Sequence, residues 1–264
     1  MQESEKHPLK FFNISKQHPV AMHIPDKRPK ETTFGVSFDS TQQRRGCAAL
    51  EVDRFAWPPL CKGLEENANT IAAPIVESIL SSSAAGKRII LIASGTRQSG
   101  RTTMAIWLAA TCARINQRIA LIDADVENPS IAQLLGVQPV AGWELFSARD
   151  QPIDEYLIDS IADRYTVLPC TDNQSPSHWP HSWDLASIFE GLRDHYDAVL
   201  VDMPPLARKE LGRQMLDDCA PFVDAALWLD TSPTDTRWAL KQFQTAGVQM
   251  LGLVQRAQLA ARAA

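Results

Sequence analysis

Paired metal-binding cysteines, long apolar runs and a leader pattern are all missing from this sequence. Its five cysteines, spread over 264 residues, form no CxxC pair, so the sequence predicts neither a disulfide framework nor a zinc site. No apolar run reaches the roughly 18 residues that a membrane-spanning helix needs, and the opening segment MQESEKHPLKFF does not follow the signal-peptide pattern. We therefore expect a cytoplasmic protein with reduced thiols.

A strongly basic folded region is also missing. Residues 1–45 carry eight Lys or Arg and five Asp or Glu, a net charge of +3, which leaves −8 for the remainder of a chain whose total is −5. Proteins that bind nucleic acid present a basic surface to the phosphate backbone. The composition therefore predicts that nucleic acid is not a partner.

Composition divides the chain into three parts. Residues 1–50 mix Pro, His, Lys, Gln and Ser with few adjacent apolar positions, so burial cannot offset the entropy lost on ordering, and we expect a mostly disordered tail. Residues 51–86 are more apolar and form a leading helical segment. Residues 87–258 have the regular pattern of a single main domain.

The leading segment shows helical spacing around a proline. Ile71, Ile75 and Ile79 recur every four residues, which is typical of one helix face. Pro74 lies within this pattern and predicts a helix that starts or bends there, because proline has no N–H to donate. We expect this helix to pack on the main domain.

Short runs rich in Ile, Leu and Val alternate with amphipathic segments in the main domain. Strands that alternate with helices predict an α/β fold, a doubly wound and mostly parallel sheet with helices on both faces. Ligands of such sheets bind beyond the carboxyl ends of the strands. Helices are expected at 101–115, 183–194 and 235–246, and strands in the runs RIILIAS, RIALIDAD, YTVLPC, YDAVLVDMP, AALWLD and MLGLVQ.

The segment after the first run, SGTRQSGRTT at 94–103, nearly matches a phosphate-binding loop. It fits GxxxxGK[ST] at every fixed position except Lys, where Arg101 stands. Such a loop and the helix that follows it attract phosphate oxygens through backbone N–H groups. A strand-turn-helix corner without a ligand is the alternative interpretation. The expected nucleotide-binding residues are Gly95, Thr96, Arg97, Gln98, Ser99, Gly100, Arg101, Thr102 and Thr103.

Carboxylates follow two further runs. Asp123 and Asp125 end the run LIDAD, where they suit a hard cation or the orientation of a nucleophile, although they could instead cap a short helix begun by Pro129. Asp202 ends YDAVLVD, the place of the Mg²⁺-binding carboxylate in P-loop proteins, although an Asp is also common at turns. Because all three motifs fall at one edge of one sheet, the sequence predicts a P-loop NTPase fold.

From about residue 70 to 256 the sequence resembles bacterial tyrosine kinases of the capsular and exopolysaccharide type, the CpsD/CapB group within the MinD/ParA class of P-loop ATPases. The resemblance rests on the loop at 94–103 and on LIDADVENPSIAQLLGV, GWELFSARDQPIDEYL and YDAVLVDMPPL. It implies ATP and Mg²⁺ as cofactors. It also implies that Thr102, Asp123 and Asp202 surround the metal, and that Asp123, Asp125 and Arg101 are catalytic.

The chain departs from this family at the residues closest to the chemistry. Arg101 replaces the loop lysine, and Gln98 and Ser99 replace the usual Gly and Glu. Glu127 stands where the family commonly has Arg, which reverses a charge near the phosphates. The family's terminal cluster of tyrosines is missing as well, because the chain ends VQRAQLAARAA. These differences predict slow turnover and exclude an autokinase that modifies such a cluster.

Two hypotheses of function remain, together with a weaker third. The first is an ATP-dependent protein-tyrosine kinase that regulates capsular or exopolysaccharide synthesis and export. The second is a catalytically impaired nucleotide-binding adaptor of the same export machine, and the third is a MinD/ParA-like ATPase. The resemblance implies a membrane-embedded polysaccharide co-polymerase or export protein as the partner through which the chain associates with the membrane, and it leaves homo-oligomer formation open.

Overall fold

A computed structural model describes most of the chain. The described residues are 9–12, 48, 50–65, 68–146, 152–171, 182–206, 210–230 and 232–256. The helices among them are α1 (Pro59–Glu65), α2 (Ala68–Ala84), α3 (Arg101–Arg114), α4 (Ile131–Leu134), α6 (Ser182–His195), α7 (Glu210–Cys219) and α8 (Pro233–Ala246), with the 3-10 segments η1 (Trp143–Leu145) and η2 (Ile153–Tyr156).

The strands form one continuous sheet in the order β1-β9-β8-β3-β7-β4-β6-β5-β2. The central strands from β9 to β6 are all parallel, whereas β1 runs antiparallel to β9 and β5 runs antiparallel to β6. The strands are β1 (Leu9–Phe12), β2 (Leu50–Val52), β3 (Ile89–Ser94), β4 (Ile119–Asp123), β5 (Ile158–Ser160), β6 (Tyr165–Leu168), β7 (Ala198–Asp202), β8 (Ala225–Asp230) and β9 (Gln249–Arg256).

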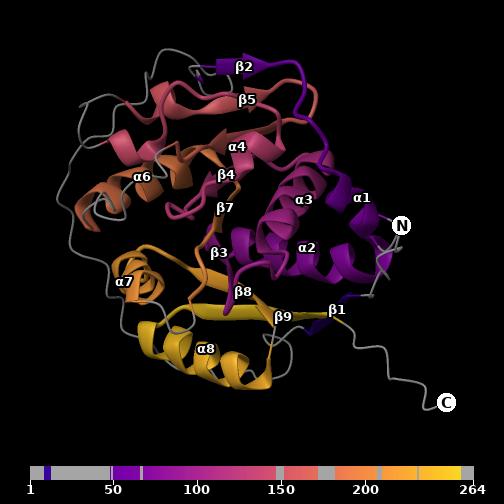
Figure 1. The fold of residues 1–264 in the computed structure, drawn as a ribbon, viewed down its shortest axis with the longest axis vertical. Coiled ribbons are helices and arrows are strands. Elements are labelled where there is room, and N and C mark those ends of the chain that lie inside the picture. The colour runs from indigo at the N-terminus through magenta and orange to yellow at the C-terminus, as the bar shows by residue number, and fades with distance from the viewer. Residues whose placement is uncertain are drawn as a thin grey trace.

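Helices cover both faces of the sheet, as Figure 1 shows for α1, α2 and α3 on one side and α6, α7 and α8 on the other. Side chains alternate between the faces along each strand, so Ile90 and Ile92 of β3 pack under α2 and α3, whereas Ile89 and Leu91 pack on the opposite side. Both faces of the sheet are therefore buried, which explains the almost unbroken apolar runs in the sequence.

The expected α/β fold is confirmed. Each of the six predicted strands is present, and the predicted helices correspond to α3, α6 and α8. Gly247 ends α8 in the left-handed conformation, with φ of 78°. The predicted apolar face of α6 is buried in one cluster, formed by Leu185, Ile188, Phe189 and Leu192.

Three strands at the sheet edges were not predicted. β1 lies in the segment expected to be mostly disordered, and the remainder of that segment falls almost wholly outside the described residues. β2 and β5 have three residues each, too few for a periodic pattern to be read from sequence. Their pairing with neighbouring strands, rather than local propensity, makes them strands.

The leading helix α2 begins at Ala68 and continues through Pro74, so the expected start at Pro74 is wrong. Pro74 lies inside this 17-residue helix, and burial of Ile75 and Ile79 against the core compensates for one missing backbone bond. Within the described residues, no helix is both long enough and apolar enough to cross a bilayer.

Candidate functional site

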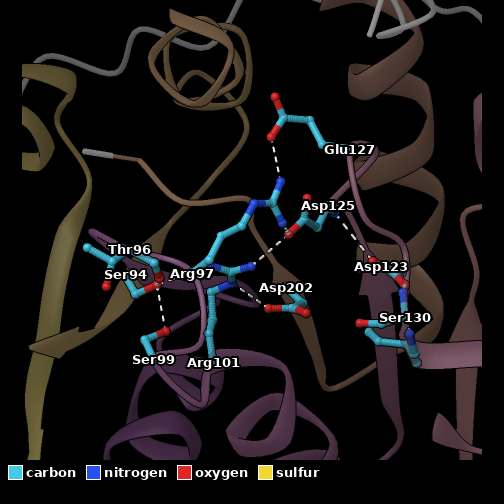
Figure 2. A network of polar contacts seen from close by, with 11 residues as sticks. Ser94, Thr96, Arg97, Ser99, Arg101, Asp123, Asp125, Glu127, Ser130 and Asp202 are labelled. Carbon is cyan, nitrogen blue, oxygen red and sulfur yellow. Dashed lines mark hydrogen bonds and ion pairs between the residues drawn. The ribbon is translucent and has the colours of Figure 1, made fainter. Parts of the chain in front are cut away.

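The three motifs meet because their strands are neighbours with matched ends. β7 lies between β3 and β4, and Asp202 of β7 pairs in register with Asp123 of β4 and with Ile92 of β3. The segment 94–103 leaves the same edge of the sheet directly after β3. The site predicted at this edge is therefore assembled, and Figure 2 shows its polar residues together.

The backbone of the loop forms a turn into α3. Gln98 and Gly100 have positive φ angles of 59° and 88°, and α3 begins at Arg101 without a side chain that caps its first turn. The N–H groups of a first helical turn have no partner within the helix, and their partial positive charge attracts anions. Loop and helix together offer the backbone donors of a phosphate site.

Arg101 does not extend into that loop as a phosphate-binding lysine would. It is 6% exposed and is directed at the carboxylates that follow β4 and β7. Its Nε donates to Oδ1 of Asp202 at 2.7 Å, and its Nη2 donates to Oδ2 of Asp125 at 3.0 Å. Nη1 donates to the hydroxyl of Ser94 at 3.0 Å. One guanidinium therefore joins the ends of all three strands.

Ser94, the last residue of β3, anchors the loop. Its hydroxyl donates to the carbonyl oxygen of Thr96 at 3.1 Å and accepts a hydrogen bond from Ser99 at 2.8 Å, in addition to the one from Arg101. The sequence analysis did not select Ser94, although its place at a carboxyl strand end was a signal that could have identified it.

Arg97 forms a second ion-pair system above the first. Nη1 lies 3.2 Å from Oδ2 of Asp125, and Nη2 lies 2.5 Å from Oε2 of Glu127. Figure 2 shows the guanidinium groups of Arg97 and Arg101 both facing Asp125. The reversed charge at Glu127 is thus balanced by Arg97, a residue of the phosphate-type loop.

Asp123 has the capping role that the sequence left open as an alternative. Its Oδ2 accepts from the backbone N–H groups of Ser130 and Ile131 at 2.8 and 2.9 Å, and its Oδ1 accepts from that of Asp125 at 3.3 Å. Burial and the nearby Asp202 raise the pKa of Asp123 to about 8, although the bonds from Ile131 and Ser130 oppose this shift. Both oxygens hold the loop after β4, and neither faces solvent.

In Asp125 and in Asp202, one carboxylate oxygen accepts a hydrogen bond from Arg101 and the other oxygen has no hydrogen-bond partner within the part of the chain that the structure describes. Burial raises the pKa of both groups, whereas Arg101 lowers it at both, with Arg97 contributing at Asp125 and Thr102 at Asp202. Among the described residues, Oδ1 of Asp125 and Oδ2 of Asp202 are buried and lack a hydrogen-bond partner. The hydrogen bond by which Thr102 lowers the pKa of Asp202 places these two side chains close together.

The phosphate-loop motif implies Mg²⁺, and the arrangement of these side chains does not fit it. Mg²⁺ takes oxygen ligands in near-octahedral geometry and is usually held by one or two carboxylates with phosphates and waters. Here the guanidinium of Arg101 already lies between Asp125 and Asp202, so a divalent cation would share their charge with another cation in a buried setting. The described residues also contain no group of three or more His, Cys, Asp or Glu side chains that could hold a metal.

The other predicted loop residues line the same turn. Thr96 and Gln98 are exposed, whereas Gly95 is buried. A Cβ at Gly95 would lie 3.1 Å from the Cβ of Asp235 in the first turn of α8, so the loop and α8 approach closely at a glycine. Thr103 lies within α3, where its carbonyl oxygen accepts a weak bond from the thiol of Cys61.

Comparison with known proteins agrees with the P-loop fold. The ParA family, described as NUBPL iron-transfer P-loop NTPase, matches residues 85–259. An iron-sulfur cluster carrier protein of Deinococcus radiodurans is 27% identical over 178 residues, which cover 64% of this chain and 49% of the relative. The septum site-determining protein MinD of Synechocystis is 31% identical over 123 residues, which cover 44% of this chain and 45% of that relative. The chain spans about half the length of these curated relatives.

Two solved structures share the fold. The kinase domain of the Escherichia coli tyrosine kinase ETK has a TM-score of 0.61 at 18% identity, covering 82% of this chain and 94% of that domain. MinD from Pyrococcus horikoshii, solved in complex with Mg-ADP, has a TM-score of 0.54 at 20% identity, covering 63% of this chain and 68% of that protein. At these identities the likeness concerns the fold alone.

Proposed function

This chain belongs to the ParA family of P-loop NTPases, and we propose that it is a nucleotide-binding adaptor whose phosphoryl transfer is impaired. The family generally binds nucleotide and Mg²⁺. ATP is the nucleotide we propose for this chain, held by the loop from Gly95 to Thr103. The observation that carries the proposal is the position of Arg101, whose guanidinium is bonded to Asp125 and Asp202.

Binding is supported by the parts of the loop that do not depend on a lysine. The first turn of α3 has no side-chain cap, and Gly100 and Gln98 turn the backbone through positive φ angles. Backbone donors at a helix amino terminus bind phosphate through their dipoles as well as their hydrogen bonds. Replacement of the lysine leaves these donors in place, so we expect affinity to persist.

Impaired transfer is supported by the state of the three acids. A general base must reach the proton that it removes and must have a lone pair to accept it. Asp123 uses both oxygens to hold backbone N–H groups, and Asp125 is paired with both Arg97 and Arg101. Arg101 and Arg97 lower the pKa of Asp125 against the larger opposing effect of burial, and both cations hold the same oxygen of this carboxylate. All of the Asp123 oxygens and one Asp125 oxygen are therefore engaged in structural bonds.

The partner that we propose is a membrane-embedded polysaccharide co-polymerase or export protein. The resemblance of the loop, the LIDADVENPS segment and YDAVLVDMPPL to capsular and exopolysaccharide kinases supports this choice, as does the shared fold with a tyrosine-kinase domain. In this proposal, nucleotide binding changes the loop between β4 and α4, and the partner detects that change. The membrane is reached through the partner.

Cluster transfer, which the name of the Deinococcus relative indicates for that protein, is not proposed for this chain. The sequence has no CxxC pair, and the cysteines within the described residues, Cys61, Cys112, Cys170 and Cys219, are buried in the core. Buried thiols are poor metal ligands because burial disfavours the thiolate.

Calorimetry and a turnover assay test the proposal together. Titration of ATP into the wild-type chain should show saturable binding, and ADP release should not exceed that of a sample without protein. The Asp202→Ala variant serves as the site-directed comparison, and its dissociation constant for ATP should differ from that of wild type. Absence of nucleotide binding to folded wild-type chain would disprove the adaptor proposal, and steady ADP release would replace it with an enzyme.

Transfer of a phosphoryl group to a tyrosine is the second candidate function. It is favoured by the closeness of Thr102 to Asp202, which retains part of a P-loop catalytic arrangement. The chain's own tyrosines, Tyr156, Tyr165 and Tyr196, are 2%, 3% and 7% exposed, so a substrate tyrosine would have to come from a partner. Incorporation of labelled phosphate into a tyrosine-containing copolymer by wild-type chain, and its loss in Asp202→Ala, would establish this activity.

A further inference from the structure

The guanidinium of Arg101 occupies the place where a nucleotide site of this fold needs a cation. We propose that Arg101 is a built-in cation that replaces Mg²⁺, so that the chain binds its nucleotide with an affinity that does not depend on a divalent metal. The inference rests on the proposed function, because it concerns how the same site holds a nucleotide.

The geometry gives Arg101 the bonds of a bridging cation. Nε and Nη2 reach one oxygen each of Asp202 and Asp125, at 2.7 and 3.0 Å, and Nη1 reaches Ser94. The three acceptors come from the ends of β7, β4 and β3, so the guanidinium fixes their relative positions. A hydrated divalent ion between two carboxylates would have the same positioning effect.

Burial makes this arrangement hard to exchange for a metal. Arg101 is 6% exposed, and the side chains of Asp125 and Asp202 are 5% and 0% exposed. A divalent ion at the two carboxylate oxygens that lack a partner among the described residues would lie beside the buried guanidinium, and repulsion between two cations in a buried setting is unfavourable. The guanidinium cannot release its proton to relieve that cost.

Arg101 also has donors left for a ligand. A guanidinium has five N–H groups, and the bonds to Asp202, Asp125 and Ser94 use three of them. In this proposal, the other two donate to phosphate oxygens of the nucleotide held by the loop. Arg97 adds a second guanidinium on the solvent side, held by Asp125 and Glu127.

A lysine at position 101 would not reproduce this arrangement. Its ammonium group is a compact point charge without a planar fork, so it would not bridge two carboxylates and a hydroxyl in the same way. The Arg101→Lys variant should therefore leave one acid without its partner and restore the need for a metal. Arg118→Lys is the matched control, because it makes the same chemical change at an arginine that is paired with Asp197 outside the loop.

The test is calorimetric titration of ATP into the purified full-length chain in excess MgCl₂ and, separately, in EDTA. Wild type and Arg118→Lys should show dissociation constants that agree between the two conditions to within about twofold. Arg101→Lys should bind at least about tenfold more weakly in EDTA than in MgCl₂. A role of Arg101 in stability alone would lower the affinity equally in both conditions.

Three results would count against the inference. Wild-type binding that is lost in EDTA but present in MgCl₂ would overturn it and leave the proposed adaptor function intact. No binding of wild type in either condition would overturn the proposed function and the inference together. If Arg101→Lys binds ATP with equal affinity in the two conditions, Arg101 is not the reason that binding is independent of a divalent metal. Circular dichroism establishes whether each variant is folded. If Arg101→Lys does not fold, the comparison of wild-type ATP binding in MgCl₂ and in EDTA tests the inference by itself.

Discussion

Nε of Arg101 donates a 2.7 Å hydrogen bond to Oδ1 of Asp202, and the two residues are 101 positions apart in the chain. The first begins the helix after the phosphate-type loop, and the second ends the strand beside it. Both side chains are buried. A residue that appears in sequence to be a weakened phosphate ligand is therefore a partner of the carboxylates below the loop.

Loss of the Arg101 side chain should strongly destabilise the fold. Arg101→Ala leaves the buried carboxylate of Asp202 without its cation and leaves Asp125 with Arg97 alone. Removal of one partner of a buried pair typically costs about 3–5 kcal/mol in the free energy of unfolding. Urea denaturation followed by circular dichroism measures this loss. The exposed Arg97, changed to Ala, should cost less than about 1 kcal/mol. Similar losses for the two variants would contradict the assigned burial and pairing.

The stability of the protein should fall as the pH rises through the neutral range. The pKa of Asp123 is raised to about 8 in the folded state, from about 3.9 in an unfolded chain. The folded state therefore holds an extra proton between these values. The contribution of Asp123 to stability is fully present below about pH 4 and decreases as the pH rises to about 8, by up to roughly 1.4 kcal/mol per pH unit. Other acidic groups add their own contributions to the measured dependence of the free energy of unfolding on pH.

The Asp123→Asn variant separates this contribution from the others. It cannot ionise, so its free energy of unfolding should depend less steeply on pH between 5 and 8 than that of wild type. Asp202 and Asp125, whose pKa values are also raised, retain part of the slope. Denaturant titrations at several pH values provide the comparison, and identical slopes would show that Asp123 is ionised throughout this range.

Two glycines allow the effect of backbone strain to be separated from an effect on the site. Gly100 and Gly86 have φ angles of 88° and 79°, and a Cβ at either position would meet no atom within 4 Å. Substitution by Ala should cost about 1–2 kcal/mol at each, because L-residues disfavour this conformation. Only Gly100→Ala should weaken nucleotide binding in calorimetry, and an equal effect of Gly86→Ala would show that the loop is not the site.

Asp224 should be a strong determinant of stability far from the site. Its Oδ2 accepts from the backbone N–H groups of Arg88 and Ile89 at 2.8 and 2.9 Å and from Arg193 at 2.6 Å. Asp224→Ala removes the acceptor for three donors and should cost about 2–3 kcal/mol in thermal or urea unfolding. Glu65→Ala, which breaks an exposed pair with Arg114, should cost under about 1 kcal/mol.

Local pattern was sufficient to predict the main sheet and the position of the site. The six apolar runs can be recognised because each parallel strand is buried on both faces, and the residues after them gather because parallel strands end at one edge. Asp123, Asp202 and the loop from Gly95 to Thr103 lie together for this reason. The edge strands β1, β2 and β5 escaped prediction because they are short and depend on their neighbours for pairing.

Tertiary structure alone decided what the site residues bind. The sequence shows an arginine in a lysine position, but whether Arg101 faces a phosphate or Asp202 depends on which acceptors lie within reach of its side chain once the strands are packed. The same holds for Asp123, whose capping bonds to Ser130 and Ile131 exist only because the loop returns to the end of β4. Spacing along a chain determines where charges gather, whereas three-dimensional distance and burial determine which of them neutralise one another.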